Sequence, residues 1–183
     1  SGAFCKPGDK VLVTGTMGHH AITTMSCREE LSSNADIQTD AAPLNHLIAE
    51  VIAAAPDTRC FRDPTRGGLA STLNELAAQS GVDFIVVEGA VPVKGAVLGA
   101  CEMLGYGVYQ VANEGKMVCV VPAEQAEAAL AAMRANKYGA DAAIIGEVEE
   151  TPEERDPRVS IRTGFGALRI MDMLVGEQLP RIC

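Results

Sequence analysis

The chain has 183 residues and a formal net charge of −9, with 48% hydrophobic and 21% charged residues. This composition is typical of a soluble globular protein with one core, and it excludes a disordered chain. The acidic balance and the few aromatic residues argue against nucleic acid or an anionic membrane as the main partner. No apolar run approaches the roughly 20 residues of a membrane span.

Hydrophobic periodicity and the turn residues divide the chain into short segments. In chain order, we predict a strand at 10–14, helices at 18–31 and 43–52, a strand at 59–62, a helix at 69–79, a strand at 84–87, a helix at 97–104, strands at 108–112 and 117–121, a helix at 122–136, and strands at 143–149 and 159–163. A further segment at 168–174 fits either a strand or a helix. Pro122 is expected at the first position of its helix.

Strands and helices are intermixed, without an internal repeat or a long linker. We therefore predict an α+β fold in which a mixed sheet is layered with helices, as α/β/α. The chain starts without Met, at Ser1. This start is consistent either with an expression scar or with the cut edge of a longer protein.

The six cysteines do not form a recognisable motif, because no two form a C-x-x-C pair and their gaps are irregular. This spacing predicts neither a zinc site nor a disulfide framework, and it favours a reducing cytoplasm. Cys101 and Cys119 lie in apolar stretches and are predicted to be buried and inert. Cys183 is the last residue, and a thiol on a mobile tail is a candidate carrier of a covalent group. The alternative is a frayed end that happens to carry Cys.

The strongest internal motif lies directly before the third predicted helix. Gly67 and Gly68 let backbone N–H groups approach an anion at the positive end of that helix. Arg66 adds a guanidinium that can donate two hydrogen bonds to a phosphate, and Thr65 adds a hydroxyl. Asp63 adds a carboxylate that could hold a magnesium ion or pair with an arginine. The Walker pattern is absent. A structural interpretation, with Asp63 as helix N-cap and the glycines for close packing, remains open.

A second motif, N-E-G-K at residues 113–116, lies between two predicted strands. Asn and Gly favour turn dihedral angles, so a plain hairpin is one interpretation. Glu114 at this turn is also a candidate general base. The turn after the first strand carries His19 and His20, and one of them is a candidate phosphate or substrate contact. Adjacent histidines on a regular element do not readily share one metal, so no metal site is predicted.

Together these motifs resemble the family of the hydrogenase maturation factor HypE. The resemblance rests on D-P-T-R-G-G-L and L-N-E within residues 63–75, on N-E-G-K at 113–116, and on the terminal P-R-I-C at 180–183. T-D-A-A-P-L at 39–44 is similar to a further family segment. After the first strand the family usually has Gly-Asp-His-Gly, whereas residues 18–21 read Gly-His-His-Ala, so two positions depart from the family pattern.

HypE belongs to the PurM-like superfamily of aminoimidazole ribonucleotide synthetase, whose members use ATP to activate an oxygen as a phosphate ester. The resemblance implies a PurM-like C-terminal domain at residues 1–174 and a mobile tail at 175–183. It also implies that an N-terminal domain, which supplies much of the ATP site and the homodimer interface, is absent from this chain. The isolated chain is then expected to hold an incomplete ATP site.

The resemblance further implies a reaction sequence. HypF loads a carbamoyl group onto Cys183, ATP with Mg²⁺ phosphorylates the carbamoyl oxygen, and loss of phosphate and the N–H protons leaves a thiocyanate. The cyano group then passes to iron on a HypC–HypD complex. Glu114 is the candidate base near the amide nitrogen, and Asn113 and His20 are candidate substrate contacts. Residues 63–68 are the candidate phosphate-binding loop.

Two other interpretations remain open. The first is a different PurM-like ATP-dependent enzyme, such as a relative of selenophosphate synthetase or thiamine-phosphate kinase, against which the P-R-I-C ending argues. The second is a non-catalytic docking module that presents Cys183 to partner proteins. Nucleotide binding separates the docking module from the enzyme.

Overall fold

The computed structural model describes residues 2–28 and 42–173, and it describes residues 24–28 by their backbone only. The predicted tail at 175–183 with Cys183, and residues 39–41 of the family-like segment, lie outside the described residues. None of the helices in the described part is long and apolar enough to cross a membrane.

The described strands form one seven-stranded sheet with the order β2-β4-β1-β5-β3-β6-β7. Neighbouring strands run antiparallel, except β3 and β6, which run parallel, so the sheet is mixed. The strands are β1 (Lys10–Val13), β2 (Cys60–Arg62), β3 (Asp83–Val87), β4 (Val118–Val121), β5 (Ala143–Glu149), β6 (Val159–Arg162) and β7 (Leu168–Ile170). Because this order departs from the chain order, segments that are distant in sequence lie at neighbouring strand ends.

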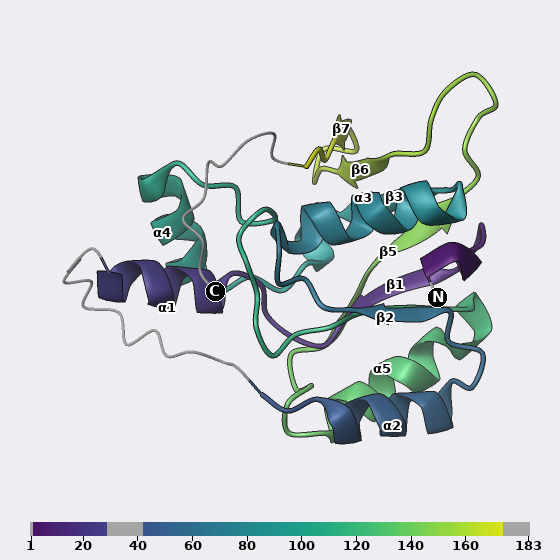
Figure 1. The fold of residues 1–183 in the computed structure, drawn as a ribbon, viewed down its shortest axis with the longest axis horizontal. Coiled ribbons are helices and arrows are strands. Elements are labelled where there is room, and N and C mark those ends of the chain that lie inside the picture. The colour runs from purple at the N-terminus through teal and green to yellow at the C-terminus, as the bar shows by residue number, and fades with distance from the viewer. Residues whose placement is uncertain (1, 29–41, 174–183) are drawn as a thin grey trace.

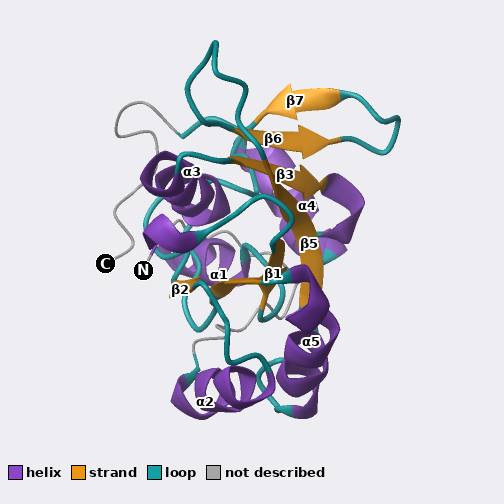
Figure 2. Cartoon of the chain, turned by 90° about the vertical axis from the view of Figure 1, so that its right-hand side faces the viewer, coloured by secondary structure: helices purple, strands orange, loops and turns teal. Residues whose placement is uncertain are grey.

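Helices cover both faces of this sheet, with α3 on one face and α2 and α5 on the other (Figure 1). Figure 2 shows the same layers from the side. The helices are α1 (His19–Arg28), α2 (Asn45–Ala54), α3 (Gly68–Ser80), α4 (Gly95–Leu104) and α5 (Ala126–Ala135), with short 3-10 helices at Gly2–Phe4, Glu88–Ala90 and Ala123–Gln125. The predicted α+β fold with helices on both sides of a mixed sheet is confirmed.

Strand alternation explains why both faces need a helix layer. In β1, Val11 and Val13 are buried under α3, whereas Leu12 is buried on the opposite face with α2 and α5. β4 repeats this alternation, with Val120 on the α3 side and Cys119 on the other. Successive side chains of a strand point to opposite faces of the sheet. An uninterrupted apolar strand such as β4 therefore needs a helix layer on each face.

A third, smaller core holds α1 and α4 together at one end of the sheet, on the left in Figure 1. The segment that follows α4 contributes valines to this core. Its buried residues are Ala21, Ile22, Val97, Cys101, Val108 and Val111.

The predicted strand at 108–112 is wrong, and so is the hairpin interpretation of residues 113–116. β4 pairs with β1 and β2, and the segment before it is an irregular loop. Val108 and Val111 looked like strand residues because they are apolar and β-branched. They are buried against α1 and α4 instead, three residues apart, which is not a strand repeat.

Smaller differences occur at element ends. Pro122 precedes a 3-10 helix, and α5 begins only at Ala126, so the proline is not at the first position of the α-helix. The undecided segment after residue 168 forms β7, an exposed edge strand of three residues. All three residues of β7 are exposed, so this strand lacks the alternation of buried and exposed residues that normally distinguishes a strand from a helix.

Candidate functional site

The loop before α3 is shaped by its two glycines. Gly67 is the N-cap of α3 with φ of 67°, and Gly68 follows with φ of 64°, so both lie in the left-handed region that favours glycine. No side chain caps the helix, so the interpretation of Asp63 as N-cap is wrong. The glycines therefore leave the backbone at the helix N-terminus uncovered by a capping side chain.

Gly68 is also required by a close contact with the loop after α4. A Cβ atom at Gly68 would lie 2.5 Å from the carbonyl oxygen of Val111 and 2.6 Å from that of Tyr109. The backbone N–H of Ala70 donates to the same Tyr109 oxygen at 2.9 Å. The first turn of α3 is thus held directly against residues 109–111, and any side chain at position 68 would separate the two segments.

Asn113 connects three of the predicted motifs. Its side-chain Oδ1 accepts a hydrogen bond from the backbone N–H of Gly18 at 2.6 Å, and its Nδ2 donates to Val111 at 3.0 Å. Its own backbone N–H donates to the carbonyl of Pro64 at 3.1 Å. Asn113 is only 2% exposed. Both groups of its amide are used inside the chain, which favours a positioning role over the predicted substrate contact.

The turn after β1 is joined to the N-E-G-K segment by a second set of contacts. Thr14 and Met117 exchange two hydrogen bonds of 3.0 Å, one from each backbone N–H. A Cβ at Gly15 would lie 3.1 Å from Cε of Lys116, so the aliphatic part of this lysine passes over the glycine. Lys116 is 8% exposed, and sequence reasoning did not single it out. No local sequence pattern predicts that Lys116 packs against Gly15, because the two residues are far apart in the chain.

The structure thus brings the glycine-rich loop, the turn at Gly18 and the N-E-G-K segment side by side. Around this junction Asp63 and Arg66 are exposed. Thr65, Glu114 and His20 are half-buried. The segments that meet here carry a hydroxyl on Thr65, a guanidinium on Arg66 and a carboxylate on Glu114, and these groups suit binding of an anion beside a general base.

Two thiols that were predicted to be buried lie outside this junction, in apolar clusters. Burial raises the pKa of Cys101, and it raises the pKa of Cys119 to about 12. Both side chains therefore stay protonated at neutral pH and are poor nucleophiles. Their predicted burial is confirmed.

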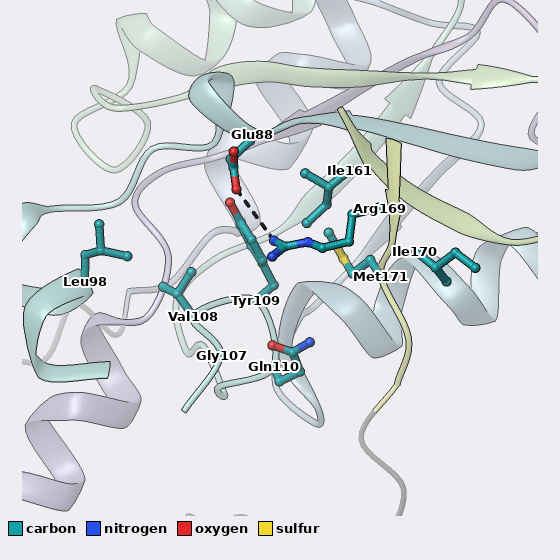
Figure 3. Close-up of a pocket in the computed structure, with 10 residues that line it drawn as sticks. All are labelled: Glu88, Leu98, Gly107, Val108, Tyr109, Gln110, Ile161, Arg169, Ile170 and Met171. Atoms are coloured by element: carbon teal, nitrogen blue, oxygen red, sulfur yellow. Dashed lines mark ion pairs between the residues drawn. The ribbon is translucent and has the colours of Figure 1, made fainter. Parts of the chain in front are cut away.

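A cavity of about 350 Å³ is lined in part by the loop that follows α4 (Figure 3). Arg169 of β7 and Glu88 form an ion pair of 3.6 Å at its edge. Burial, together with the charge of Glu88, raises the pKa of Tyr109 in its wall. The lining residues are Glu88, Leu98, Gly107, Val108, Tyr109, Gln110, Ile161, Arg169, Ile170 and Met171. Tyr109 connects the cavity to the glycine-rich loop, because its carbonyl accepts a hydrogen bond from the first turn of α3 while its ring lines the cavity.

Comparison with known protein families identifies the fold. The profile described as AIR synthase related protein, C-terminal domain, matches residues 6–156, most of the chain. The chain belongs to this family. The match contains the glycine-rich loop and the N-E-G-K segment, so the motifs that converge in the structure lie inside the family domain.

Relatives within this family include HypE proteins, as the sequence resemblance predicted. Carbamoyl dehydratase HypE of Azotobacter vinelandii is 52% identical over 183 residues, which cover 100% of this chain and 53% of the relative. The chain spans about half the length of the curated relatives it matches.

Solved structures agree with this similarity. The hydrogenase maturation protein HypE in complex with ATP superimposes with a TM-score of 0.92 at 44% identity, covering 100% of this chain and 55% of that one. A HypE–HypF complex gives 0.89 at 44% identity, with 95% and 55% covered. Thiamine monophosphate kinase of Aquifex aeolicus, at 17% identity and a TM-score of 0.54 over 94% of this chain and 53% of that one, shares the fold alone.

Replacing Asn113 by alanine is expected to lower the free energy of unfolding by about 2 kcal/mol, because the buried N–H of Gly18 loses its acceptor. Urea denaturation measures this loss. Gln125→Ala is the matched control, since this amide also makes two hydrogen bonds, both to Asp57 and both at the surface. The control should lose about 0.5 kcal/mol or less. Equal losses in the two variants would contradict the connecting role of Asn113.

Proposed function

We propose that this chain is the C-terminal part of an ATP-dependent carbamoyl dehydratase of the HypE type. The observation that carries the proposal is the 52% identity to such an enzyme over the whole chain. The convergence of the glycine-rich loop with the N-E-G-K segment through Asn113 supports it. Residues 1–174 then form the C-terminal domain, and residues 175–183 form the tail that carries the reactive thiol.

In this proposal the thiol of Cys183 first accepts a carbamoyl group and becomes an S-carbamoyl cysteine. Transfer of the terminal phosphoryl group of ATP to the carbamoyl oxygen makes that oxygen a good leaving group. A base then removes the remaining protons from nitrogen while the carbon–oxygen bond breaks and phosphate departs, which leaves a thiocyanate on sulfur. Glu114 is the proposed base, because it is half-buried and lies next to the positioning residue Asn113.

The glycine-rich loop is proposed to bind the transferred phosphate. Both glycines have positive φ, and no side chain makes a capping hydrogen bond at the N-terminus of α3. Arg66 and Thr65 would supply a guanidinium and a hydroxyl, and the helix end adds positive potential. Preorganised donors of this kind stabilise the charge that develops as phosphate is transferred and released.

A magnesium ion would need ligands from elsewhere. Within the described residues no group of three or more His, Cys, Asp or Glu side chains could hold a metal ion. Asp63 alone does not make a metal site. Since this chain spans about half the length of its relatives, we propose that both ATP and Mg²⁺ require the N-terminal half that those relatives have.

The proposed partners follow from the same relationship. A HypE–HypF complex has been solved for a similar protein, and we propose HypF as the carbamoyl donor for this chain. A HypC–HypD complex is the proposed acceptor of the cyano group, and homodimer formation is proposed for a chain that carries the N-terminal half. The docking-module interpretation remains the alternative for the isolated domain.

Intact-mass spectrometry after incubation with HypF, carbamoyl phosphate and ATP tests the proposal. We expect a mass gain of one carbamoyl group that maps to Cys183, because the thiolate of this residue is the proposed nucleophile. Cys183→Ala should abolish the gain, while the matched control Cys101→Ala, a buried thiol, should retain it.

The same assay is repeated on a chimera in which the N-terminal half of the Azotobacter vinelandii relative precedes this chain. A carbamoyl adduct on the chimera alone would show that HypF docking needs that half. No adduct on either protein would reject the proposed function. An adduct that persists without conversion to thiocyanate in the chimera with ATP would reject the dehydratase step and support the docking module.

A further inference from the structure

Two cysteines that are far apart in the sequence touch in the core. Cys5 follows the first 3-10 helix and Cys60 begins β2, 55 residues later, yet their Sγ atoms lie 3.9 Å apart. Cys5 is 4% exposed and Cys60 is 7% exposed. Both belong to the apolar cluster under α3. The irregular cysteine spacing had predicted no disulfide framework, and this contact depends on the fold.

We propose that Cys5 and Cys60 form a reversible oxidation site, which converts to an intrachain disulfide when the protein meets a hydroperoxide. The two sulfur atoms are in van der Waals contact, so bond formation needs them to approach further by about 2 Å. Cys5 lies in the loop between the first 3-10 helix and β1, whereas Cys60 is fixed in the ladder with β4, where it pairs with Val120. Movement of the loop that carries Cys5 is therefore the simpler way to close the bond.

The pKa values of the two thiols shift in opposite directions. A hydrogen bond from Cys60 lowers the pKa of Cys5 against the opposing effect of burial. The same hydrogen bond, together with burial, raises the pKa of Cys60. With Cys60 as the donor of this hydrogen bond, Cys5 is the proposed attacking thiol and Cys60 the proposed resolving thiol.

The chemistry balances with a hydroperoxide as the only oxidant. With hydrogen peroxide, the Cys5 thiolate attacks one peroxide oxygen, the O–O bond breaks, and the hydroxide that leaves takes up a proton to become water. This step leaves Cys5 as a sulfenic acid. The Cys60 sulfur then attacks the Cys5 sulfur, the S–O bond breaks, and a second water forms with the Cys60 proton. Two thiols lose two electrons in total, and the peroxide gains them.

The other buried thiols in the described part of the chain are not arranged in this way. Cys119 lies on the opposite face of the sheet with α2 and α5, and Cys101 lies in the small core between α1 and α4. Burial is the cause that raises the pKa of each. They provide matched buried controls that differ from Cys5 mainly in having no cysteine partner among the described residues.

The new bond would act close to the candidate site. Cys60 opens β2, and that strand runs directly into the glycine-rich loop before α3. The N-terminal segment is already tied to the far end of α3, because Ser80 donates a hydrogen bond to the carbonyl of Gly2. A disulfide would therefore join the segment that contacts the far end of α3 to the strand that leads into the near end of this helix.

The test is peptide mapping of the folded chain after treatment with hydrogen peroxide and alkylation of the remaining thiols under denaturing conditions. We expect a cross-linked peptide joining Cys5 to Cys60, a mass loss of two hydrogen atoms, and full reversal by dithiothreitol. In Cys60→Ser, the cross-link should be absent and a sulfenic acid on Cys5 should be trapped by dimedone. Cys119→Ser should give the same cross-link as the unaltered chain.

The unaltered chain alone decides the result if a serine variant fails to fold. A cross-link that joins other cysteines, or both Cys5 and Cys60 recovered as alkylated thiols after peroxide has oxidised exposed methionines, would overturn the proposal. The assignment of the attacking thiol would be overturned if dimedone labels Cys60 in Cys5→Ser but does not label Cys5 in Cys60→Ser. None of these outcomes depends on carbamoyl dehydratase activity.

Discussion

Gly68→Ala is expected to lower the free energy of unfolding by roughly 3 kcal/mol. Two effects add: an alanine at positive φ costs about 1 kcal/mol or more, and the new methyl group overlaps two backbone carbonyl groups that cannot rotate away. The first turn of α3 must then separate from residues 109–111, which also displaces the glycine-rich loop. Urea denaturation followed by circular dichroism measures the loss.

Gly81→Ala is the matched control for this variant. Gly81 ends the same helix with φ of 69°, but nothing lies within 4 Å of the position that its Cβ would occupy. The control should therefore lose only about 1 kcal/mol, from the dihedral strain alone. If both variants lose the same stability, the close approach of Gly68 to Tyr109 and Val111 contributes nothing and the proposed packing of the loop is wrong.

Asp83→Asn is expected to cost about 2 kcal/mol at neutral pH, because the carboxylate at the start of β3 anchors a distant loop. Asp83 is 4% exposed and accepts hydrogen bonds from Thr151 at 2.9 Å and from the backbone N–H of Arg158 at 3.0 Å. Arg155 donates to both of its oxygens. An amide at this position keeps one acceptor but turns an NH₂ group toward these donors. Asp156→Asn, on the exposed part of the same loop, should change stability by about 0.5 kcal/mol or less.

The pH dependence of this loss gives a second measurement. Burial opposes ionisation of Asp83, but the hydrogen bonds from Arg155, Arg158 and Thr151 outweigh it and hold the pKa below its ordinary value. A carboxyl whose pKa is lower in the folded state stabilises the fold above the unfolded pKa, near 4, and this contribution is lost as the pH falls through the folded pKa. The stability gap between the parent chain and Asp83→Asn should therefore narrow below about pH 4. A gap that stays constant down to pH 2 would contradict the charged interaction.

Several parts of the fold were predictable because their signals are local. Leu69, Leu73 and Leu76 repeat at helical spacing, and Gly81 ends that helix where a left-handed residue is needed. The strand at 143–149 was predicted with its observed bounds. The prediction failed at 108–112, where two valines serve the core between α1 and α4 rather than a strand.

The candidate site was predictable in its parts but not in its assembly. The glycines before α3 and the N-E-G-K segment stand out from composition and turn chemistry. The hydrogen bond from Gly18 to Asn113 joins residues 95 positions apart, and no periodicity links them. The buried position of Lys116 over Gly15 depends on the same packing.

The sequence by itself determined most of the helices and strands, the glycines at the ends of α3, and the family motifs that the chain carries. These properties depend on residues within a few positions of one another, where backbone sterics and side-chain periodicity act. Only the tertiary structure decided the strand order, the hydrogen bond between Gly18 and Asn113, and the contact between Cys5 and Cys60. Those features arise when two helix layers close over the sheet, because burial of apolar side chains is non-directional and selects partners by shape across the whole chain.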